Sequence, residues 1–154
     1  ALAVCLMEMR NFKSEDFAVY HPGGALGKKL LLRVKDMLDT THKPIVTPDA
    51  SIKKVIKKKK KKRLGVTAVI ENNQVVGIVT DGDIRRMLNN RDTFTDLTAQ
   101  DIMTKNPKNI NSDILVSEAL DILENNSITQ LVVVDNNEYK GILHLHDISK
   151  EGIV

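Results

Sequence analysis

Two apolar runs separated by a polar turn form the most regular pattern in this sequence. The runs Val66–Ile70 and Val75–Val79 are rich in β-branched residues and flank the Asn72-Asn73 pair, which tolerates positive φ. This pattern predicts a β-hairpin. Thr80 and Asp83 follow the second run as candidate N-cap residues, and the apolar spacing after them predicts a helix.

The same pattern returns 64 residues later, and the two copies correspond without a gap from Thr47 onward. An asparagine pair, a glycine in the second apolar run and an Asp-Ile pair all recur, as Asn136-Asn137, Gly141 and Asp147-Ile148. Repetition at a fixed period indicates duplicated structural units. The chain is therefore expected to contain two copies of one fold.

Each copy is expected to contain a short strand, a helix, a hairpin and a final helix. A unit of this kind has one good apolar sheet face, so two copies are expected to pack those faces together. The predicted fold class is α/β (α+β), with two pseudo-twofold-related β-α-β-β-α units. The strands are expected at 45–46, 66–70, 75–79, 109–110, 130–135 and 139–144, and the helices at 28–38, 51–63, 84–88 and 114–126. The predicted boundaries are 1–33 for a preceding segment, 34–90 for repeat 1, 91–98 for a linker and 99–154 for repeat 2.

The composition argues against base stacking on nucleic acid, an intrachain disulfide and a membrane span. Aromatic residues make up 3% of the chain and tryptophan is absent, so side chains that could stack on nucleic-acid bases are scarce. The single Cys5 excludes an intrachain disulfide and fits a reducing cytoplasm. No apolar run has the length of a membrane span, so no membrane partner is expected. Because the chain begins at Ala1 inside an apolar stretch, we expect it to be part of a longer protein.

The net charge of +3 depends on one homopolymeric run, Lys57–Lys62. Removing those six lysines from the 23 basic residues leaves 17 against 20 acidic residues, a net charge of −3. By the 64-residue correspondence, Lys58 and Lys59 match Ile122 and Leu123, so an amphipathic helix here would place unpaired ammonium groups in its apolar stripe. We interpret the run as not belonging to the natural sequence. A solvated surface run and a nucleic-acid-binding patch are the alternatives.

Each repeat closes on the pattern Gly-apolar-apolar-(Ser/Thr)-x-x-Asp, which reads GIVTDGD in the first copy and, with His in place of Ser/Thr, GILHLHD in the second. With this pattern the two repeats resemble a tandem cystathionine-β-synthase (CBS) domain pair. The resemblance implies a regulatory module that binds adenosine nucleotides in clefts between the repeats. It implies ligand-binding roles for Thr80, Asp83 and Asp147, and His144 stands where the family pattern has Ser or Thr.

The chemistry of these residues is compatible with two roles. A carboxylate can accept hydrogen bonds from both hydroxyls of a ribose, and a hydroxyl beside helix N-terminal amides suits phosphate oxygens. The alternative is that Asp83 and Asp147 only cap their helices. His144 and His146 would share a face if their strand continued, a spacing compatible with a metal ion, but no third ligand is evident and no metal is expected.

The N-terminal segment DFAVYHPGGALGKKLLLRVKDML resembles the junction of arabinose-5-phosphate isomerases, where a sugar-isomerase (SIS) domain is followed by a CBS pair. The resemblance implies that residues 1–33 are the C-terminal remnant of that domain. It also implies a parent enzyme that interconverts ribulose 5-phosphate and arabinose 5-phosphate for synthesis of the acidic sugar Kdo, a component of lipopolysaccharide or capsule. His21 matches the family histidine that reaches the active site, but this chain alone would not be catalytically complete.

The resulting hypothesis is a regulatory CBS module that needs no cofactor and binds CMP-Kdo or an adenosine nucleotide as its effector. His144 adds bulk and a titratable donor, which suits a carboxylate-bearing sugar. We expect a homo-oligomer formed through the CBS pairs, with no nucleic-acid partner. The alternative is a CBS pair that serves only as a dimerisation module and binds no small ligand.

Overall fold

The structure is a computed structural model that describes residue 27 and residues 31–39, 43–60 and 65–152. His21 and the last two residues of the lysine run therefore lie outside the described residues. Within the described part of the chain, no helix is both long and apolar enough to cross a membrane.

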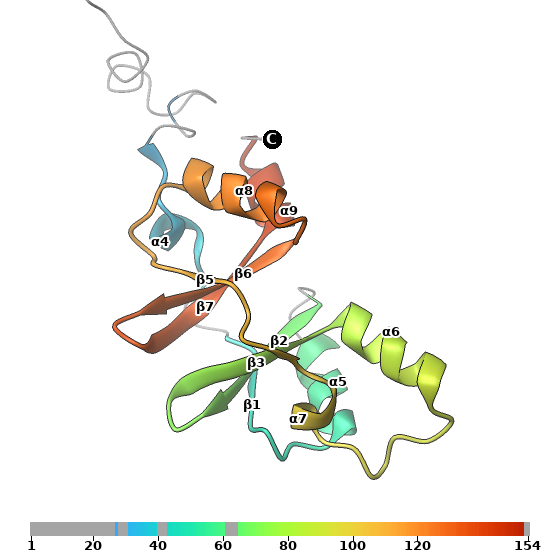
Figure 1. Ribbon diagram of the computed structural model, residues 1–154. Helices are drawn as coiled ribbons and strands as arrows, with labels where there is room; N and C mark the ends of the chain where they lie inside the picture. Colours follow the sequence, from blue (N-terminus) through green and yellow to red (C-terminus); the bar gives the residue numbers. More distant parts are fainter. Residues whose placement is uncertain (1–26, 28–30, 40–42, 61–64, 153–154) are drawn as a thin grey trace, which may run out of the picture.

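The two repeats contain matching elements, shown in Figure 1. The first repeat contributes β1 (Ile45–Val46), α5 (Ile52–Lys60), β2 (Val66–Glu71), β3 (Gln74–Thr80) and α6 (Asp81–Asn90). The second contributes β5 (Asn109–Ile110), α8 (Val116–Asn125), β6 (Gln130–Asp135), β7 (Glu138–His144) and α9 (Leu145–Lys150). The elements α4 (Val34–Met37), α7 (Ala99–Ile102) and β4 (Thr104–Lys105) open the two repeats. The predicted fold class, two α/β units in tandem, is confirmed.

Both predicted hairpins form with the same register. β2 pairs antiparallel with β3 and β6 with β7, and each pair has an irregularity at the same place, between Val69 and Ile70 and between Val133 and Val134. The asparagine pairs form the turns, with φ between 51° and 64° at all four residues. Asparagine tolerates this left-handed conformation, so the turn residues fix the register of each hairpin.

The segments that open the two repeats are exchanged between them. The N-terminal arm (residues 31–39, including α4) packs on repeat 2, whereas the linker arm (residues 98–105, including α7 and β4) packs on repeat 1. In Figure 1 the blue α4 accordingly lies among the orange and red elements, and the gold α7 lies among the green ones. β4 adds a fourth strand to the sheet of repeat 1, giving the order β1-β2-β3-β4, while the other sheet has the order β5-β6-β7. A Cβ added at Gly77 would lie 2.9 Å from the Thr104 carbonyl oxygen, so glycine permits the close approach of the linker arm.

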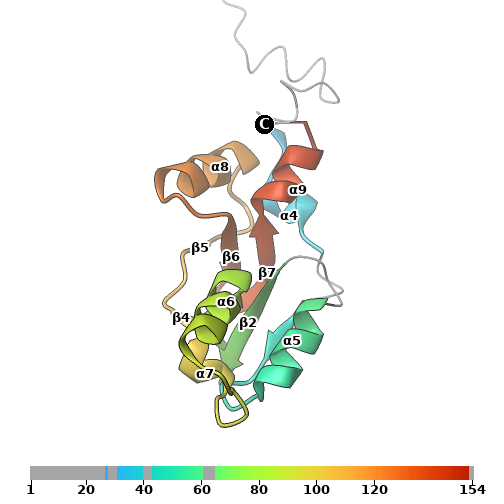
Figure 2. The ribbon, with the colours of Figure 1, turned by 90° about the vertical axis from the view of Figure 1, so that its right-hand side faces the viewer.

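Three apolar clusters form the core, and both faces of each sheet are buried. One cluster lies between the helices and sheet of repeat 2 and includes Val34 of the N-terminal arm, and a second lies in repeat 1 and includes Ala99 of the linker arm. The third joins the two sheets face to face, as predicted, and the helices lie outside them (Figures 1 and 2). Its buried members are Val66, Ala68, Ile78, Val132, Tyr139 and Ile142.

Two local expectations from the sequence are wrong. The helix predicted over 28–38 is interrupted, because Arg33 is extended (φ −103°, ψ 158°) and forms a β-bridge with Leu115 before α4 begins. In the lysine run, Lys58 is exposed, and Lys59 is 5% exposed but forms an ion pair with Asp81. The expected unpaired ammonium groups in the apolar stripe are therefore not found at either position, whereas the interpretation that the run does not belong to the natural sequence stays a prediction.

Candidate functional site

The ends of β3 and β7 line a common cavity between the two repeats. Its volume is about 210 Å³, and Thr80 and His144, two of the four predicted ligand-binding residues, both face it. The cavity is smaller than the range of roughly 300–1,000 Å³ that holds drug-sized ligands, so it suits a phosphate or a sugar better than a whole nucleotide. The remaining lining residues are Gly65, Val66, Asp81, Gly82, Thr129 and Gln130.

Thr80 and Asp83 form a complete capping box at the start of α6. The Thr80 backbone N–H donates to Asp83 Oδ2 at 2.8 Å, and the Asp83 backbone N–H donates to Thr80 Oγ1 at 3.2 Å. Thr80 reaches this position because it is the last residue of β3 and keeps an extended backbone (φ −104°, ψ 170°). The cap leaves Thr80 at the wall of the cavity, with its hydroxyl bonded to Asp83.

Asp83 is buried and its carboxylate is used within the protein. The side chain is 1% exposed, and Oδ1 accepts hydrogen bonds from the Arg86 guanidinium at 3.1 Å and the Thr104 hydroxyl at 3.0 Å. Oδ2 accepts from the Thr80 backbone and hydroxyl. Asp83 therefore caps α6 and holds the linker arm, which supplies Thr104. Its role as a ligand-binding residue stays a prediction.

His144 takes the position of Thr80 in the second repeat and caps α9 with a ring nitrogen. Its Nδ1 accepts the His146 backbone N–H at 3.0 Å, and its own backbone N–H donates to Asp147 Oδ2 at 3.4 Å. β7 ends at His144, so His144 and His146 do not share a strand face. Among the described residues, no group of three His, Cys, Asp or Glu side chains could hold a metal ion.

Asp147 is less constrained than Asp83. It is half-buried, and the bond from the His144 backbone N–H is long for a bond to a carboxylate. It does not line the cavity between the repeats. The two predicted carboxylates thus have different surroundings, although their positions in the repeats are the same.

Burial lowers the pKa of His144, an effect that the Asp147 carboxylate opposes and the neighbouring His146 reinforces. The capping role also requires a neutral ring, because Nδ1 can accept a hydrogen bond only while it is unprotonated. At neutral pH His144 is therefore neutral with its proton on Nε2.

Folding stability is expected to rise with pH as the unfolded histidine loses its proton. Because the folded pKa of His144 lies below the unfolded value of about 6.5, the unfolded state binds more protons between the two values. The contribution is complete above the unfolded pKa and is lost as pH falls through the folded pKa. The slope for one site is at most about 1.4 kcal/mol per pH unit. Urea unfolding at pH 5, 6 and 7.5 would measure it, with His144→Thr as the comparison because threonine also caps helices without titrating. Equal pH slopes in the two proteins would contradict the assignment.

The lining residues at the starts of the strands were not predicted from the sequence. Gly65 and Thr129 are equivalent under the 64-residue offset, and so are Val66 and Gln130. The duplication contained this signal, because two equivalent positions that flank a pseudo-twofold axis come together in space. Asp81, which lines the cavity and pairs with Lys59, could not be found in this way because its equivalent, Leu145, is apolar.

Two larger cavities lie at the hairpin turns and are related by the same pseudosymmetry. One of about 320 Å³ includes Gln74 and Val75, and one of about 500 Å³ includes the equivalent Glu138 and Tyr139. None of the four predicted ligand-binding residues lines either cavity. The cavity lined by Thr80 and His144 is therefore the candidate site that the predictions and the structure share.

Comparison with known proteins identifies the two repeats. The CBS domain family model matches residues 34–90 and 99–153. This chain belongs to the CBS domain family. Solved structures of CBS proteins superpose on this CBS pair: CBS domain protein NE2398 does so with a TM-score of 0.71 at 22% identity, covering 79% of this chain and 98% of that one.

A second solved CBS pair, that of protein MJ0100, is 28% identical and superposes with a TM-score of 0.65, covering 77% of this chain and 93% of that one. That structure is a complex with 5′-methylthioadenosine and S-adenosyl-L-methionine. The predicted resemblance to tandem CBS pairs is confirmed by these matches.

The similarity to isomerases extends over the whole chain. Arabinose 5-phosphate isomerase KdsD of Escherichia coli K12 is 40% identical over 156 residues, which cover 100% of this chain and 48% of the isomerase. An uncharacterized protein of Helicobacter pylori J99 is 43% identical over 155 residues, which cover 99% of this chain and 47% of that protein. The chain thus spans about half the length of the curated relatives that it matches.

Proposed function

We propose that this CBS pair is the regulatory module of an arabinose 5-phosphate isomerase and binds a phosphate-bearing effector between its repeats. The observation that carries the proposal is the cavity lined by both Thr80 and His144, because it brings the family's ligand positions from the two repeats to one place. The identity of 40% to KdsD over the full chain supports the parent enzyme. The parent reaction would interconvert ribulose 5-phosphate and arabinose 5-phosphate for Kdo synthesis, with His21 contributing to catalysis in the intact enzyme.

The proposed effector is CMP-Kdo, of which the cavity would take the phosphate and the acidic sugar and not the whole nucleotide, with an adenosine nucleotide as the runner-up. The first turn of α6, which brings Gly82 to the cavity beside Thr80, offers backbone N–H donors to a phosphate oxygen. His144 offers an Nε2–H donor to a carboxylate while Nδ1 caps α9. The adenosine ligands bound by MJ0100 favour the runner-up. No bound cofactor is required by either proposal.

The module would act by favouring one arrangement of the parent enzyme over another. An effector can shift such an equilibrium only by the difference in its affinity for the two arrangements. We further propose a homo-oligomer formed through the CBS pairs and a cytoplasmic location, which a chain with one cysteine fits. Leu88 on α6 is 53% exposed and gives one apolar position for such a contact.

Titration calorimetry with CMP-Kdo, CMP, AMP and ATP would test the effector. We expect CMP-Kdo to bind most tightly, and Thr80→Val and His144→Ala each to weaken binding by about tenfold, or about 1.4 kcal/mol. Glu124→Gln, an exposed substitution on α8, is the matched control and should leave the affinity unchanged. Tighter binding of AMP or ATP would replace CMP-Kdo by the runner-up.

One observation favours a different function, a CBS pair that only holds copies of the parent protein together. The carboxylate oxygens of Asp83 already accept hydrogen bonds from protein groups, which leaves little capacity for a ribose. If none of the four ligands binds, sedimentation of wild-type and Leu88→Glu proteins would decide this alternative. A dimer that dissociates in the variant would support it.

A further inference from the structure

The two exchanged arms make the same backbone hydrogen bonds with the repeats that receive them. Arg33 bridges to Leu115 and Thr98 bridges to Ser51, and Ser51 and Leu115 are 64 residues apart. Two further bonds in each arm are also equivalent: the amides of Val34 and Lys35 donate to the carbonyls of Ile114 and Ser112, and those of Ala99 and Gln100 to the carbonyls of Ala50 and Pro48, at 2.9–3.0 Å. The backbone therefore holds the two arms in equivalent ways.

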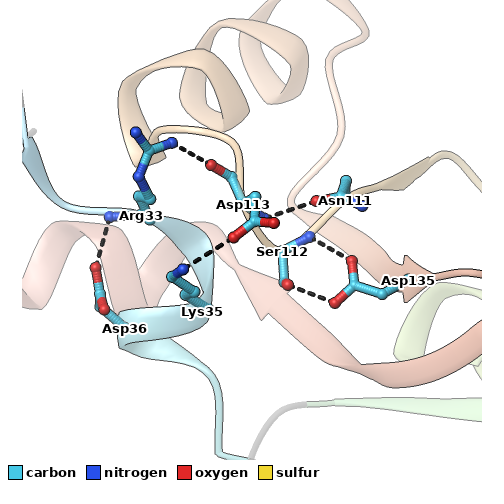
Figure 3. Close-up of polar contacts among 7 residues, drawn as sticks. All are labelled: Arg33, Lys35, Asp36, Asn111, Ser112, Asp113 and Asp135. Carbon is cyan, nitrogen blue, oxygen red and sulfur yellow. Dashed lines mark hydrogen bonds and ion pairs between the residues drawn. The ribbon is translucent and has the colours of Figure 1, made fainter.

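Among the described residues, an ion pair joins the N-terminal arm to its repeat, whereas the linker arm is joined to repeat 1 by the uncharged Thr104 hydroxyl, which donates to Asp83. Lys35 Nζ lies 2.9 Å from Asp113 Oδ1, and the Arg33 guanidinium donates to the Asp113 carbonyl oxygen. Figure 3 shows both basic side chains of the arm reaching the same residue from one side. Asp113 is thus contacted twice by the segment that leads to the preceding part of the chain.

The loop that carries Asp113 is itself held to the sheet of repeat 2. The Ser112 backbone N–H donates to Asp135 Oδ1 at 2.8 Å, and the Ser112 hydroxyl donates to Asp135 Oδ2 (Figure 3). These two bonds, the hydroxyl first, lower the pKa of Asp135, so the carboxylate stays charged at neutral pH. Asn111 Oδ1 accepts the Asp113 backbone N–H at 2.8 Å. The contacts from the arm therefore meet a loop fixed at the end of β6.

Repeat 1 cannot form this arrangement around the linker arm. The equivalent of Ser112 is Pro48, which has neither a hydroxyl nor a backbone N–H to donate. The arm residues equivalent to Arg33 and Lys35 are Thr98 and Gln100, which carry no charge. Asp49, the equivalent of Asp113, instead accepts a hydrogen bond from Thr47 at 2.5 Å. The pseudosymmetry of the pair is broken at this place.

The N-terminal arm is also connected to the candidate site through the core of repeat 2. His144 lines the cavity and caps α9, and Ile148 of α9 is fully buried in the same cluster as Val34. Val34 lies between Arg33 and Lys35 in the chain. A displacement of α9 by a ligand beside His144 would therefore reach the arm through the apolar cluster of repeat 2.

We propose that Arg33, Lys35 and Asp113 form a clasp that fastens the N-terminal arm to repeat 2, so that the polypeptide before residue 31 responds to the cavity through repeat 2 and not through repeat 1. The clasp follows from the contacts alone, and the response to a ligand rests on the function proposed above. Arg33, Lys35 and Asp113 are positioning residues in this proposal. Repeat 1 would line one side of the cavity but would have no clasp to the polypeptide before residue 31.

Amide hydrogen exchange on the 154-residue chain would test the clasp, because exchange of a bonded amide reports local opening. Asp113→Asn removes the ion pair and keeps the carbonyl, and an exposed pair of this kind is worth about a two- to fivefold change in local opening. We expect exchange at Val34 and Lys35 to accelerate by that factor, with Ala99 and Gln100 unchanged. Asp49→Asn is the matched control and should leave all four amides unchanged. Equal effects of the two substitutions on the N-terminal arm would overturn the clasp.

Hydrogen exchange at the same four amides, measured with and without a ligand, tests the clasp and the proposed function independently. With CMP-Kdo or AMP at concentrations that saturate in calorimetry, protection should change more at Val34 and Lys35 than at Ala99 and Gln100, and Asp113→Asn should reduce that difference. Equal changes in both arms would overturn the selective response. If neither compound binds, the proposed function fails, while the comparison of Asp113→Asn with Asp49→Asn still decides whether the clasp exists.

Discussion

Replacing Ile148 with alanine is expected to lower the free energy of unfolding by about 2–5 kcal/mol. The Ile148 side chain is fully buried on α9, where it packs in the repeat 2 cluster with Val34 and Leu143. Its truncation removes apolar contacts and leaves a cavity that the surrounding helices and sheet fill only in part. Urea unfolding followed by circular dichroism would measure the change.

Glu124→Ala provides the control for this experiment. Glu124 is exposed on α8, so its truncation should change the unfolding free energy by less than about 0.5 kcal/mol. Similar losses in the two variants would mean that α9 is not packed as described. Because α9 begins at the His144 cap, ligand binding to Ile148→Ala should be measured only where the folded state is fully populated.

Replacing Asp83 with alanine is expected to destabilise the protein by about 3 kcal/mol, whether or not a ligand binds. The substitution removes the carboxylate of the α6 capping box and leaves the half-buried Thr80 backbone N–H without its acceptor. It also removes the acceptor for Thr104, which joins the linker arm to repeat 1. The loss should appear in urea unfolding without any added compound.

Asp147→Ala is the matched comparison, since it occupies the same position in repeat 2. It should cost about 1 kcal/mol or less, because its single described bond is 3.4 Å long and its side chain is half-buried. Equal costs would contradict the asymmetry of the two caps. The comparison also has a practical consequence: reduced ligand binding by an Asp83 variant is informative only after its stability has been measured.

The strands and turns could be predicted closely from local sequence. β6 spans the six residues that were predicted, because its apolar run is bounded by polar residues and the asparagine pair fixes the turn. The helix starts were less accurate. The helix predicted from Ile114 begins at Val116, because Leu115 is extended and bridges to Arg33. That bridge comes from a segment about 80 residues away, so no local pattern contains it.

The exchange of arms was not predicted for a similar physical reason. Val34 and Ala99 are both fully buried, and apolar periodicity identifies them as core-facing without saying which core receives them. In the candidate site, helix capping was one of the two roles predicted for Asp83. It could be predicted because a Thr-x-x-Asp capping box is formed by residues close together in the sequence. Its bond from Thr104 could not be predicted, because it depends on the linker arm reaching repeat 1.

The arm exchange makes the tandem pair resemble two copies of a domain-swapped unit joined in one polypeptide. A single repeat made alone would leave its own opening segment without a receiving surface and would expose part of its apolar core, since each core is completed by the opening segment of the other repeat. Two separate copies could bury these apolar surfaces only by exchanging their opening segments, as domain-swapped dimers do. Because the two repeats are covalently linked, the exchange is intramolecular and does not depend on protein concentration. Two separate repeats would form the same pair only at a concentration high enough for them to associate.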